Sequence, residues 1–318
     1  MPHFSKRGSA HRPALRPHPA AGELVARPGP VRLRGSSAGA RGLAPVTPAP
    51  GAPRPAVAEV SLSPGSRSGP TRDELKLCGL AAVRARFARD PGSIQRLFFE
   101  HATGQRVGAI CQVLAQGKKI YRQVEPAELE KIAGSVHHGG IVAVVAPPAL
   151  RSPTADEVRA WAKRGETVLL LDRIGNAHNL GAIARTAAFF GVRQVVLPDH
   201  PGAARPTDAA HRVAEGGLEH LTVWLTKNLA GHARELVAAG FEVIGAATRG
   251  GRPDAVRRER AAKPIALVLG NEEHGLSLET AAACSRLVTL PGSGKVESLN
   301  VSVAAGVLMW ELFARRAQ

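Results

Sequence analysis

The sequence predicts an α/β protein whose C-terminal part is a doubly wound parallel sheet. Two strand-length runs, Val168–Leu171 and Ile265–Leu269, are almost continuously aliphatic, as in parallel strands buried on both faces. Predicted strands and helices alternate from about Asp73 onward, which indicates βαβ units. Aromatic residues make up only 4% of the 318 residues, so we expect aliphatic cores.

Composition divides the chain into four segments. We expect a tail at residues 1–71, a small α/β/α domain at 72–150, a linker at 151–165 and the larger domain at 166–318. The formal net charge of +16 favours a polyanionic partner, because basic charge attracts phosphates over long range. No apolar run reaches the roughly 18 residues that span a bilayer, so no membrane association is expected.

The tail is rich in Pro, Gly, Ala and Arg and has no sustained apolar period. It cannot bury enough apolar surface to offset the entropy of ordering, so it is predicted to be disordered. Half of the net charge lies there, which suits non-specific RNA contact, but a merely solvated extension explains the composition equally well. A transit peptide is less favoured, because the many prolines oppose the amphipathic helix that it needs.

The small domain is predicted to alternate helices with strands. The helices are expected at Glu74–Arg89, Gln105–Ala115 and Pro126–Ala133, and the strands at Ile94–Phe99, Lys118–Val124 and Ile141–Val145. Basic side chains along these elements suggest an RNA-facing surface, although a solvated helix side explains each one singly.

The larger domain repeats a strand followed by a helix. Its strands are expected at Thr167–Asp172, Val192–Leu197, Leu221–Leu225, Phe241–Ala247, Ile265–Gly270 and Leu287–Leu290. Its helices are expected at Leu180–Phe190, Leu229–Ala239, Ser277–Cys284 and Leu299–Arg315, with Ser298 as the N-cap of the last one. A further short helix is expected in the linker at Thr154–Lys163.

Three polar stretches follow predicted strands: Asn176–Arg185, Gly270–Leu276 and Leu290–Trp310. In an open parallel sheet, ligands bind at the carboxyl ends of the strands, so these stretches are expected to meet in one site. Each is weak evidence alone, but the three in this order are far more specific.

Other classes of site fit poorly. His137-His138 has no Cys, Asp or Glu at ligand spacing, so we expect a turn with a structural His rather than a metal site. The three Cys are far apart without a CxxC pair, which indicates reduced thiols and a cytoplasmic protein. A nicotinamide-dependent dehydrogenase would need a GxGxxG after the first strand of the larger domain, and that motif is missing there.

The three stretches together resemble the motifs of the SpoU/TrmH branch of the SPOUT RNA methyltransferases. The matching residues are Asn179-Leu-Gly-Ala-Ile-Ala-Arg185, Gly270-Asn-Glu272, and Leu290-Pro-Gly through Glu297-Ser-Leu-Asn300. The resemblance covers Glu166 to the C-terminus closely, and Leu75–Pro147 is more loosely similar to the ribosomal-protein-like substrate-binding domain of several members. The family has an acid–proline pair in many relatives where this chain has Asn176-Ala177-His178.

This resemblance implies a deep trefoil knot in the C-terminal domain. It implies S-adenosylmethionine bound by backbone groups of the knot loops, here at Gly270, Leu290 and Leu299. It also implies a homodimer, and Leu299–Trp310 would supply an apolar surface for it, although packing on the sheet explains any one of these residues equally well.

The implied reaction is methyl transfer to the 2′-hydroxyl of a ribose in RNA, with ribosomal RNA favoured over transfer RNA. Arg185 matches the proposed catalytic residue of the family. A guanidinium is a poor base, so we favour stabilisation of the developing alkoxide and a hold on the phosphate; a base role would need that phosphate to take the proton. Asn179, Ser298 and Asn300 are expected to orient Arg185, the ribose or the loops. Glu272 is expected either to anchor the loops or to pair with Arg185. The alternative is a non-catalytic RNA-binding protein with the same fold.

Overall fold

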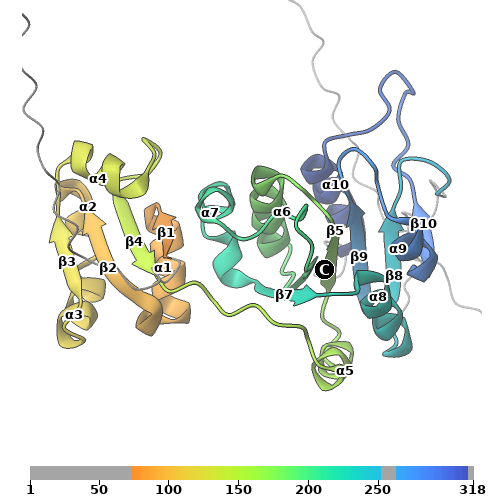
Figure 1. The fold of residues 1–318 in the computed structure, drawn as a ribbon, viewed down its shortest axis with the longest axis horizontal. Helices are drawn as coiled ribbons and strands as arrows, with labels where there is room; N and C mark the ends of the chain where they lie inside the picture. The colour runs from red at the N-terminus through yellow and green to blue at the C-terminus, as the bar shows by residue number, and fades with distance from the viewer. Residues whose placement is uncertain (1–73, 252–262, 314–318) are drawn as a thin grey trace, which may run out of the picture. The chain divides into compact units, whose positions relative to one another are not determined.

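The computed structural model describes residues 74–251 and 263–313 (Figure 1). The predicted disordered tail, residues 1–71, lies outside the described residues, as does the predicted end of the last helix at Arg315. Within the described ranges, no helix is long and apolar enough to cross a membrane.

The first described domain is built on a four-stranded sheet in the order β1-β4-β2-β3. Its strands are β1 (Leu75–Cys78), β2 (Ile94–Phe99), β3 (Ile120–Gln123) and β4 (Ile141–Val145). Its helices are α1 (Leu80–Arg89), α2 (His101–Gly104), α3 (Gly108–Gln116) and α4 (Pro126–Ala133), with a 3-10 turn at Pro91–Ser93. Strand β4 runs antiparallel to β1 and β2, whereas β3 runs parallel to β2.

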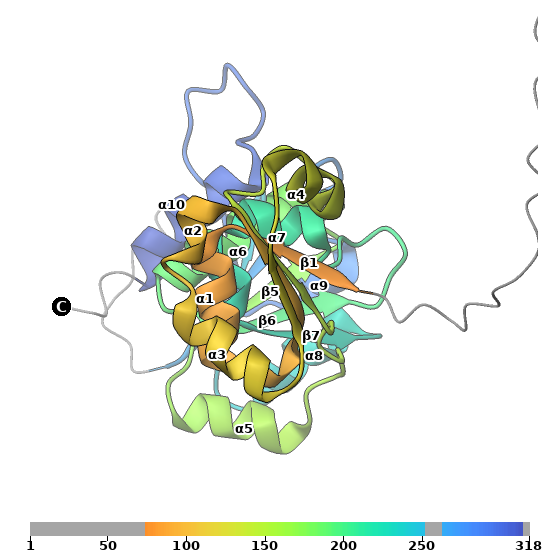
Figure 2. The same ribbon diagram turned by 90° about the vertical axis from the view of Figure 1, so that its left-hand side faces the viewer.

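Helices cover both faces of this sheet, as the sequence predicts. Val83 of α1 and Leu114 of α3 pack with the sheet residues of one face, and Leu129 of α4 packs on the other. Figure 2 shows α1 and α3 on one side of the sheet and α4 on the other.

One predicted element in this domain is wrong. The expected helix Glu74–Arg89 is a strand, β1, followed by the helix α1. Leu75 and Leu77 are both buried two residues apart, which is the strand period, and β1 pairs with β4. Gly79 then turns the chain with a φ of 88°, a backbone conformation that favours glycine, before the helix begins.

The second domain contains a parallel six-stranded sheet in the order β10-β8-β9-β5-β6-β7. The strands are β5 (Val168–Asp172), β6 (Gln194–Pro198), β7 (Thr222–Thr226), β8 (Glu242–Ala246), β9 (Ile265–Gly270) and β10 (Arg286–Val288). The helices are α5 (Ala155–Lys163), α6 (Ala177–Phe189), α7 (Asp208–Ala214), α8 (Leu229–Ala238), α9 (Leu278–Ala283) and α10 (Val301–Phe313), with a 3-10 turn at Gly217–His220.

Two aliphatic layers sandwich this sheet. Leu169 and Leu171 of the central strand β5 belong to a core shared with α6, α7 and α10. Val168 and Leu170 belong to the opposite core, which includes α5, α8 and α9. The predicted doubly wound parallel sheet is therefore confirmed.

Several boundaries differ from those predicted. The segment α7 with its following 3-10 turn was not predicted, because its few apolar residues are mostly alanines. Helix α6 begins at Ala177, where Asn176 accepts a hydrogen bond from the N–H of His178. Ser298 as the N-cap of the last helix is wrong: α10 begins at Val301, and it is the Asn300 side chain that accepts the N–H of Ser302, at 2.9 Å.

The two folded domains contact each other through α1 and β1 on one side and residues 208–221 on the other. Arg86 Nη2 donates to Glu219 Oε1 at 3.0 Å, and both side chains are buried. The backbone N–H of Lys76 donates to Asp208 at 2.9 Å. Helix α5, the helix expected within the linker, buries Trp161 in the core of the second domain.

Candidate functional site

The sheet of the second domain has a switch point between β5 and β9. From β5 the chain continues through β6 and β7 to one edge, whereas β8, β9 and β10 occupy the other half. A crevice opens at such a point on the carboxyl side of parallel strands, and this is where ligands bind in this class of sheet.

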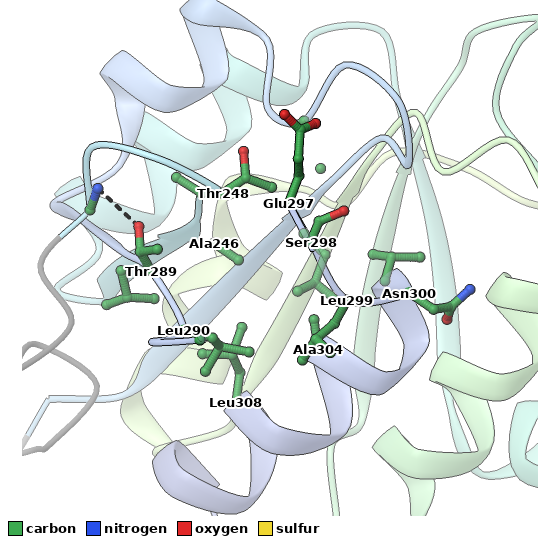
Figure 3. Close-up of a pocket in the computed structure, with 18 of the residues that line it drawn as sticks. Ala246, Thr248, Thr289, Leu290, Glu297, Ser298, Leu299, Asn300, Ala304 and Leu308 are labelled. Atoms are coloured by element: carbon green, nitrogen blue, oxygen red, sulfur yellow. Dashed lines mark hydrogen bonds between the residues drawn. The ribbon is translucent and has the colours of Figure 1, made fainter. Parts of the chain in front are cut away.

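A cavity of about 680 Å³ lies on the carboxyl side of β8, β9 and β10. The loops after these three strands and the first turns of α10 enclose it (Figure 3). Six of the eight predicted site residues line it: Gly270, Glu272, Leu290, Ser298, Leu299 and Asn300. All three predicted cofactor-binding residues are among them.

Gly270 owes its place to backbone crowding. The loop after β9 folds back on itself, because Asn271 and Gly275 exchange two backbone hydrogen bonds of 2.9 and 3.0 Å. A Cβ on Gly270 would lie 2.7 Å from the carbonyl oxygen of Gly275 and closer still to other backbone atoms of this loop. Glycine is therefore required where the loop passes over the end of β9.

Two cross-connections hold the walls of the cavity together. The N–H of Gly251 donates to the Thr289 hydroxyl at 3.0 Å, drawn as a dashed line in Figure 3. Arg249 pairs with Glu297 at 2.8 Å and so joins the loop after β8 to the loop before α10. Neither Arg249 nor Thr289 was predicted as a site residue, because their partners lie about 40 or more positions away and no local spacing relates them. Glu297 belongs to the third predicted motif, but no role was assigned to it.

The cavity lining carries two carboxylates, and one of them, that of Glu297, is paired with Arg249. The only ionisable side chains among its described lining residues are the carboxylates of Glu272 and Glu297. Apolar side chains, including Leu290, Leu299 and Leu308, line another part of the cavity (Figure 3). The cavity therefore suits a ligand with an apolar part and a positive centre.

A chain of hydrogen bonds joins the three predicted motifs. The Asn179 amide donates to Glu272 Oε1 at 2.8 Å, and Asn179 Oδ1 accepts from the Asn300 amide at 3.2 Å. Glu272 Oε2 also accepts the N–H of Gly175 at 3.1 Å. Asn179 does not line the cavity itself but connects two residues that do.

Glu272 is held as a carboxylate. Partial burial alone would raise the pKa of Glu272, but the hydrogen bonds from Asn179 and from the N–H of Gly175 outweigh it and lower the pKa below its usual value of 4.5. A carboxylate with a lowered pKa is a poor proton acceptor at neutral pH. Glu272 therefore suits a structural role, in which its hydrogen bonds hold the surrounding loops in place.

Arg185 lies apart from this cluster within its own chain. It sits two turns along α6 from Asn179 but does not line the cavity. Arg185 Nη1 instead pairs with Glu215 Oε1 at 2.9 Å, and both side chains are more than half exposed. The sequence analysis missed Glu215, since α7 and its turn were not predicted.

No group of three or more His, Cys, Asp or Glu that would suit a metal ion exists within the described ranges. The three cysteines are free. His138, half of the His-His pair, accepts the N–H of Gly140 in a turn, as the structural interpretation of that pair expects.

The fold and the cavity are those of an α/β protein with a ligand-sized site at the carboxyl ends of parallel strands. Residues 166–310 match the model of the SpoU rRNA Methylase family, and residues 76–150 match that of the RNA 2′-O ribose methyltransferase substrate-binding domain. The chain is 32% identical over 241 residues to the 23S rRNA (guanosine-2′-O-)-methyltransferase RlmB of Nitrosomonas europaea, an alignment that covers 76% of this chain and 91% of that protein. It is 35% identical to the RlmB protein of Ralstonia nicotianae, over 76% of this chain and 96% of that one.

A solved structure is similar along most of its length. The AdoMet-bound rRNA methyltransferase from Sinorhizobium meliloti superposes with a TM-score of 0.63 and 25% identity, covering 78% of this chain and 88% of that one. The chain belongs to the SpoU rRNA methylase family. It is an RNA ribose 2′-O-methyltransferase with a substrate-binding domain ahead of the catalytic one.

Proposed function

We propose that this protein transfers a methyl group from S-adenosylmethionine to the 2′-hydroxyl of a guanosine ribose in 23S rRNA. The observation that carries the proposal is the convergence of Glu272, Asn179 and Asn300, from three separate motifs, at the edge of one cavity. The choice of guanosine and 23S rRNA is supported by the names of the RlmB relatives.

The cavity fits the proposed cofactor by size and charge. Its volume of about 680 Å³ lies within the range of small-molecule sites. Leu290 and Leu299 offer an apolar wall for a purine, and the crowded backbone at Gly270 leaves main-chain groups as the contacts. The carboxylate of Glu272 suits a positive centre. Bound S-adenosylmethionine supplies a methyl group on an electrophilic sulfonium.

The remaining task of the protein is to position the ribose hydroxyl and to stabilise its partial deprotonation. Alignment of reacting groups alone is worth roughly 7–11 kcal/mol. We assign the stabilisation to Arg185, whose guanidinium stays protonated and can face both the developing alkoxide and the adjacent phosphate. Asn179, Ser298 and Asn300 orient the ribose and loops, and Glu272 anchors them.

Arg185 does not line the cavity of its own chain, so the role assigned to it requires that Arg185 reach the cavity of a second copy of the chain. Helix α10 leaves Val303, Val307 and Trp310 half exposed, and the Trp310 ring lies tilted by 57° to that of Phe190, with centroids 6.3 Å apart. Phe189, which is 83% exposed, lies one turn beyond Arg185 on the same side of α6. We propose that these apolar side chains form a homodimer interface, with Arg185 at its border and within reach of a pocket near that interface.

Three further features are part of the proposal. The loops around the cavity form a deep trefoil knot, as in the family that the sequence resembles. The domains keep the limits 72–150, 151–165 and 166–318, whereas the predicted tail, residues 1–71, lies outside the described residues. The protein works in the cytoplasm, where its RNA substrate and reduced thiols are found.

The test is methylation of purified RNA by the purified full-length chain. Incubation of 23S rRNA transcripts with the protein and radiolabelled S-adenosylmethionine should label one ribose, and reverse-transcription mapping at low nucleotide concentration should place it on a guanosine. Transfer RNA serves as the comparison substrate. Labelling of tRNA alone would show that the proposed substrate, 23S rRNA, is wrong. RNA binding without any labelling would favour the non-catalytic alternative.

A further inference from the structure

The turn after α7 lies against the backbone of α6 at Arg185. A Cβ on Gly217 would lie 2.7 Å from the Cα of Arg185 and 3.0 Å from its backbone nitrogen. Only glycine allows the two main chains to approach so closely. The position of this turn relative to Arg185 is therefore fixed by backbone contact.

Glu215 begins this turn in an unfavourable backbone conformation. Its φ and ψ are 45° and 43°, in the left-handed region, and Gly216 follows with a φ of 91°. A non-glycine residue is uncommon in this region and persists where the surrounding structure holds it. The consequence of this conformation is that the carboxylate of Glu215 meets the guanidinium of Arg185 at 2.9 Å.

The other side of the turn is held by the substrate-binding domain. A Cβ on Gly216 would lie 3.2 Å from the Cα of Ala82 in α1. Glu219 forms its buried ion pair with Arg86, and Arg89 donates to the carbonyl oxygen of Glu219 at 2.9 Å. The turn is thus packed between α6 and α1.

These contacts separate the pair Arg185–Glu215 from an ordinary surface ion pair. Exposed pairs contribute little, since two long side chains must be ordered in water. Here the main chain that carries Glu215 is fixed on both sides, so the carboxylate meets the guanidinium at a set position. One nitrogen of Arg185 is used in this contact, and the other donors remain available to a phosphate or an alkoxide.

We propose that Glu215 is a positioning residue for Arg185. It fixes the direction of the guanidinium so that the arginine meets the ribose and phosphate without searching among rotamers. The inference rests on the proposed role of Arg185 in methyl transfer. Glu215 does not line the cofactor cavity, so its effect is confined to the rate of the methyl-transfer step.

The test is single-turnover methylation of the rRNA transcript by the full-length chain with Glu215→Gln, Glu215→Asp or Glu279→Gln. Glu215→Gln should lower the single-turnover rate roughly tenfold, because the guanidinium of Arg185 is then no longer held in place and misplacement of a group at the reacting centre is costly. The half-saturating concentration of S-adenosylmethionine and the unfolding temperature should not change. Aspartate keeps the charge and should restore part of the rate. Glu279 is an exposed carboxylate on α9 and controls for the loss of one negative charge on an RNA-binding protein.

The Glu215→Gln change is then repeated in an Arg185→Lys background. A lysine is a point charge without the fork of a guanidinium, so orientation by Glu215 should matter less and the loss should shrink to about twofold or below. A wild-type rate in Glu215→Gln, or an equal loss in both backgrounds, would overturn the inference. Arg185→Ala, included in the series, separates the two hypotheses: if it stays active, the role of Arg185 in the proposed function fails; if it is inactive while Glu215→Gln is unaffected, only the positioning role fails.

Discussion

Asn179 on α6 donates its side-chain amide to Glu272 in the loop after β9, across 93 positions of sequence and a distance of 2.8 Å. This bond ties together the two halves of the sheet at their switch point. Glu272 thus accepts hydrogen bonds from residues on the opposite side of the crevice. The loop that follows Gly270 cannot move without breaking the bond between Asn179 and Glu272.

Glu272→Gln should therefore weaken cofactor binding. The glutamine oxygen can still accept from Asn179, but its NH2 group would face the N–H of Gly175, a donor against a donor. Glu272 is an exposed residue, so we expect the loss of one ordinary hydrogen bond, and the affinity for S-adenosylmethionine, measured by calorimetry, should fall by about two- to tenfold. Glu273→Gln, on the same loop but not in the cavity lining, is the control.

The lowered pKa of Glu272 sets the pH below which cofactor binding should weaken. Its pKa is lowered in the folded protein, so the charged form contributes stability above the unfolded value of 4.5, and this contribution is lost as the pH falls through the lower folded value. Cofactor affinity followed from pH 7 down to 3 should stay flat to about 4.5 and fall below it. A midpoint above pH 5 would contradict the hydrogen bonding seen here.

Arg185→Ala should abolish methylation and leave cofactor binding nearly intact. Arg185 does not line the cavity, so its loss removes stabilisation of the reacting ribose without altering the donor site. Calorimetry with S-adenosylmethionine and single-turnover assays on one protein preparation measure the two effects. A large loss of cofactor affinity would refute this division of roles.

Gly270→Ala should disrupt the pocket, because the added methyl group meets the backbone of the loop at Gly275. The loop must shift, at a cost of about 1–3 kcal/mol, and cofactor affinity should fall with it. Gly292→Ala is a matched control: this glycine also lines the cavity, but a Cβ there has open space around it. Equal effects of the two substitutions would show that crowding at Gly270 is not the cause.

Arg86→Met should destabilise the docking of the two domains. It leaves the Glu219 carboxylate, whose side chain is 1% exposed, without its guanidinium partner. Loss of one member of a buried ion pair costs about 3–5 kcal/mol. Chemical unfolding should report a loss of this size, and limited proteolysis near residues 147–154 should be faster. Arg159→Met, which breaks an exposed pair with Asp156, should change stability by less than about 1 kcal/mol.

Val307→Asp should yield a monomer, since it places a charge in the proposed apolar dimer surface of α10. Val113→Asp is the control, because Val113 has the same 40% exposure but lies on α3 of the substrate-binding domain. Light scattering coupled to size-exclusion chromatography measures the mass. If the wild-type chain is already a monomer at micromolar concentration, the dimer proposal is wrong.

Much of this architecture is visible in the sequence because burial leaves a strong local pattern. The strands β4 and β9 are continuous aliphatic runs and were predicted to the residue, as was α4, which starts at a proline. The meeting of the stretches after β9 and β10 at one cavity follows from the rule that parallel strands end on one side of the sheet, whereas the choice of Gly270, Leu290 and Leu299 within them came from the family resemblance.

Features that depend on distant partners were not predictable. Leu77 and Leu80 suit a helix as well as a strand followed by a turn, and only pairing with β4 decides between them. The partner of Arg185 lies on an element whose alanines give a weak apolar signal. The ion pair of Arg249 with Glu297 joins loops 48 positions apart, and no sequence pattern in either loop predicts that the two loops meet.

The cavity takes all of its lining from residues between Ala246 and Leu308, whereas the substrate-binding domain is complete by residue 150. Ribosomes make a chain from its N-terminus, and early domains generally fold first. On the function proposed above, a nascent copy of this protein has its substrate-binding domain before it has the cavity assigned to the methyl donor. That cavity is complete only when β9, β10 and α10 have all been made.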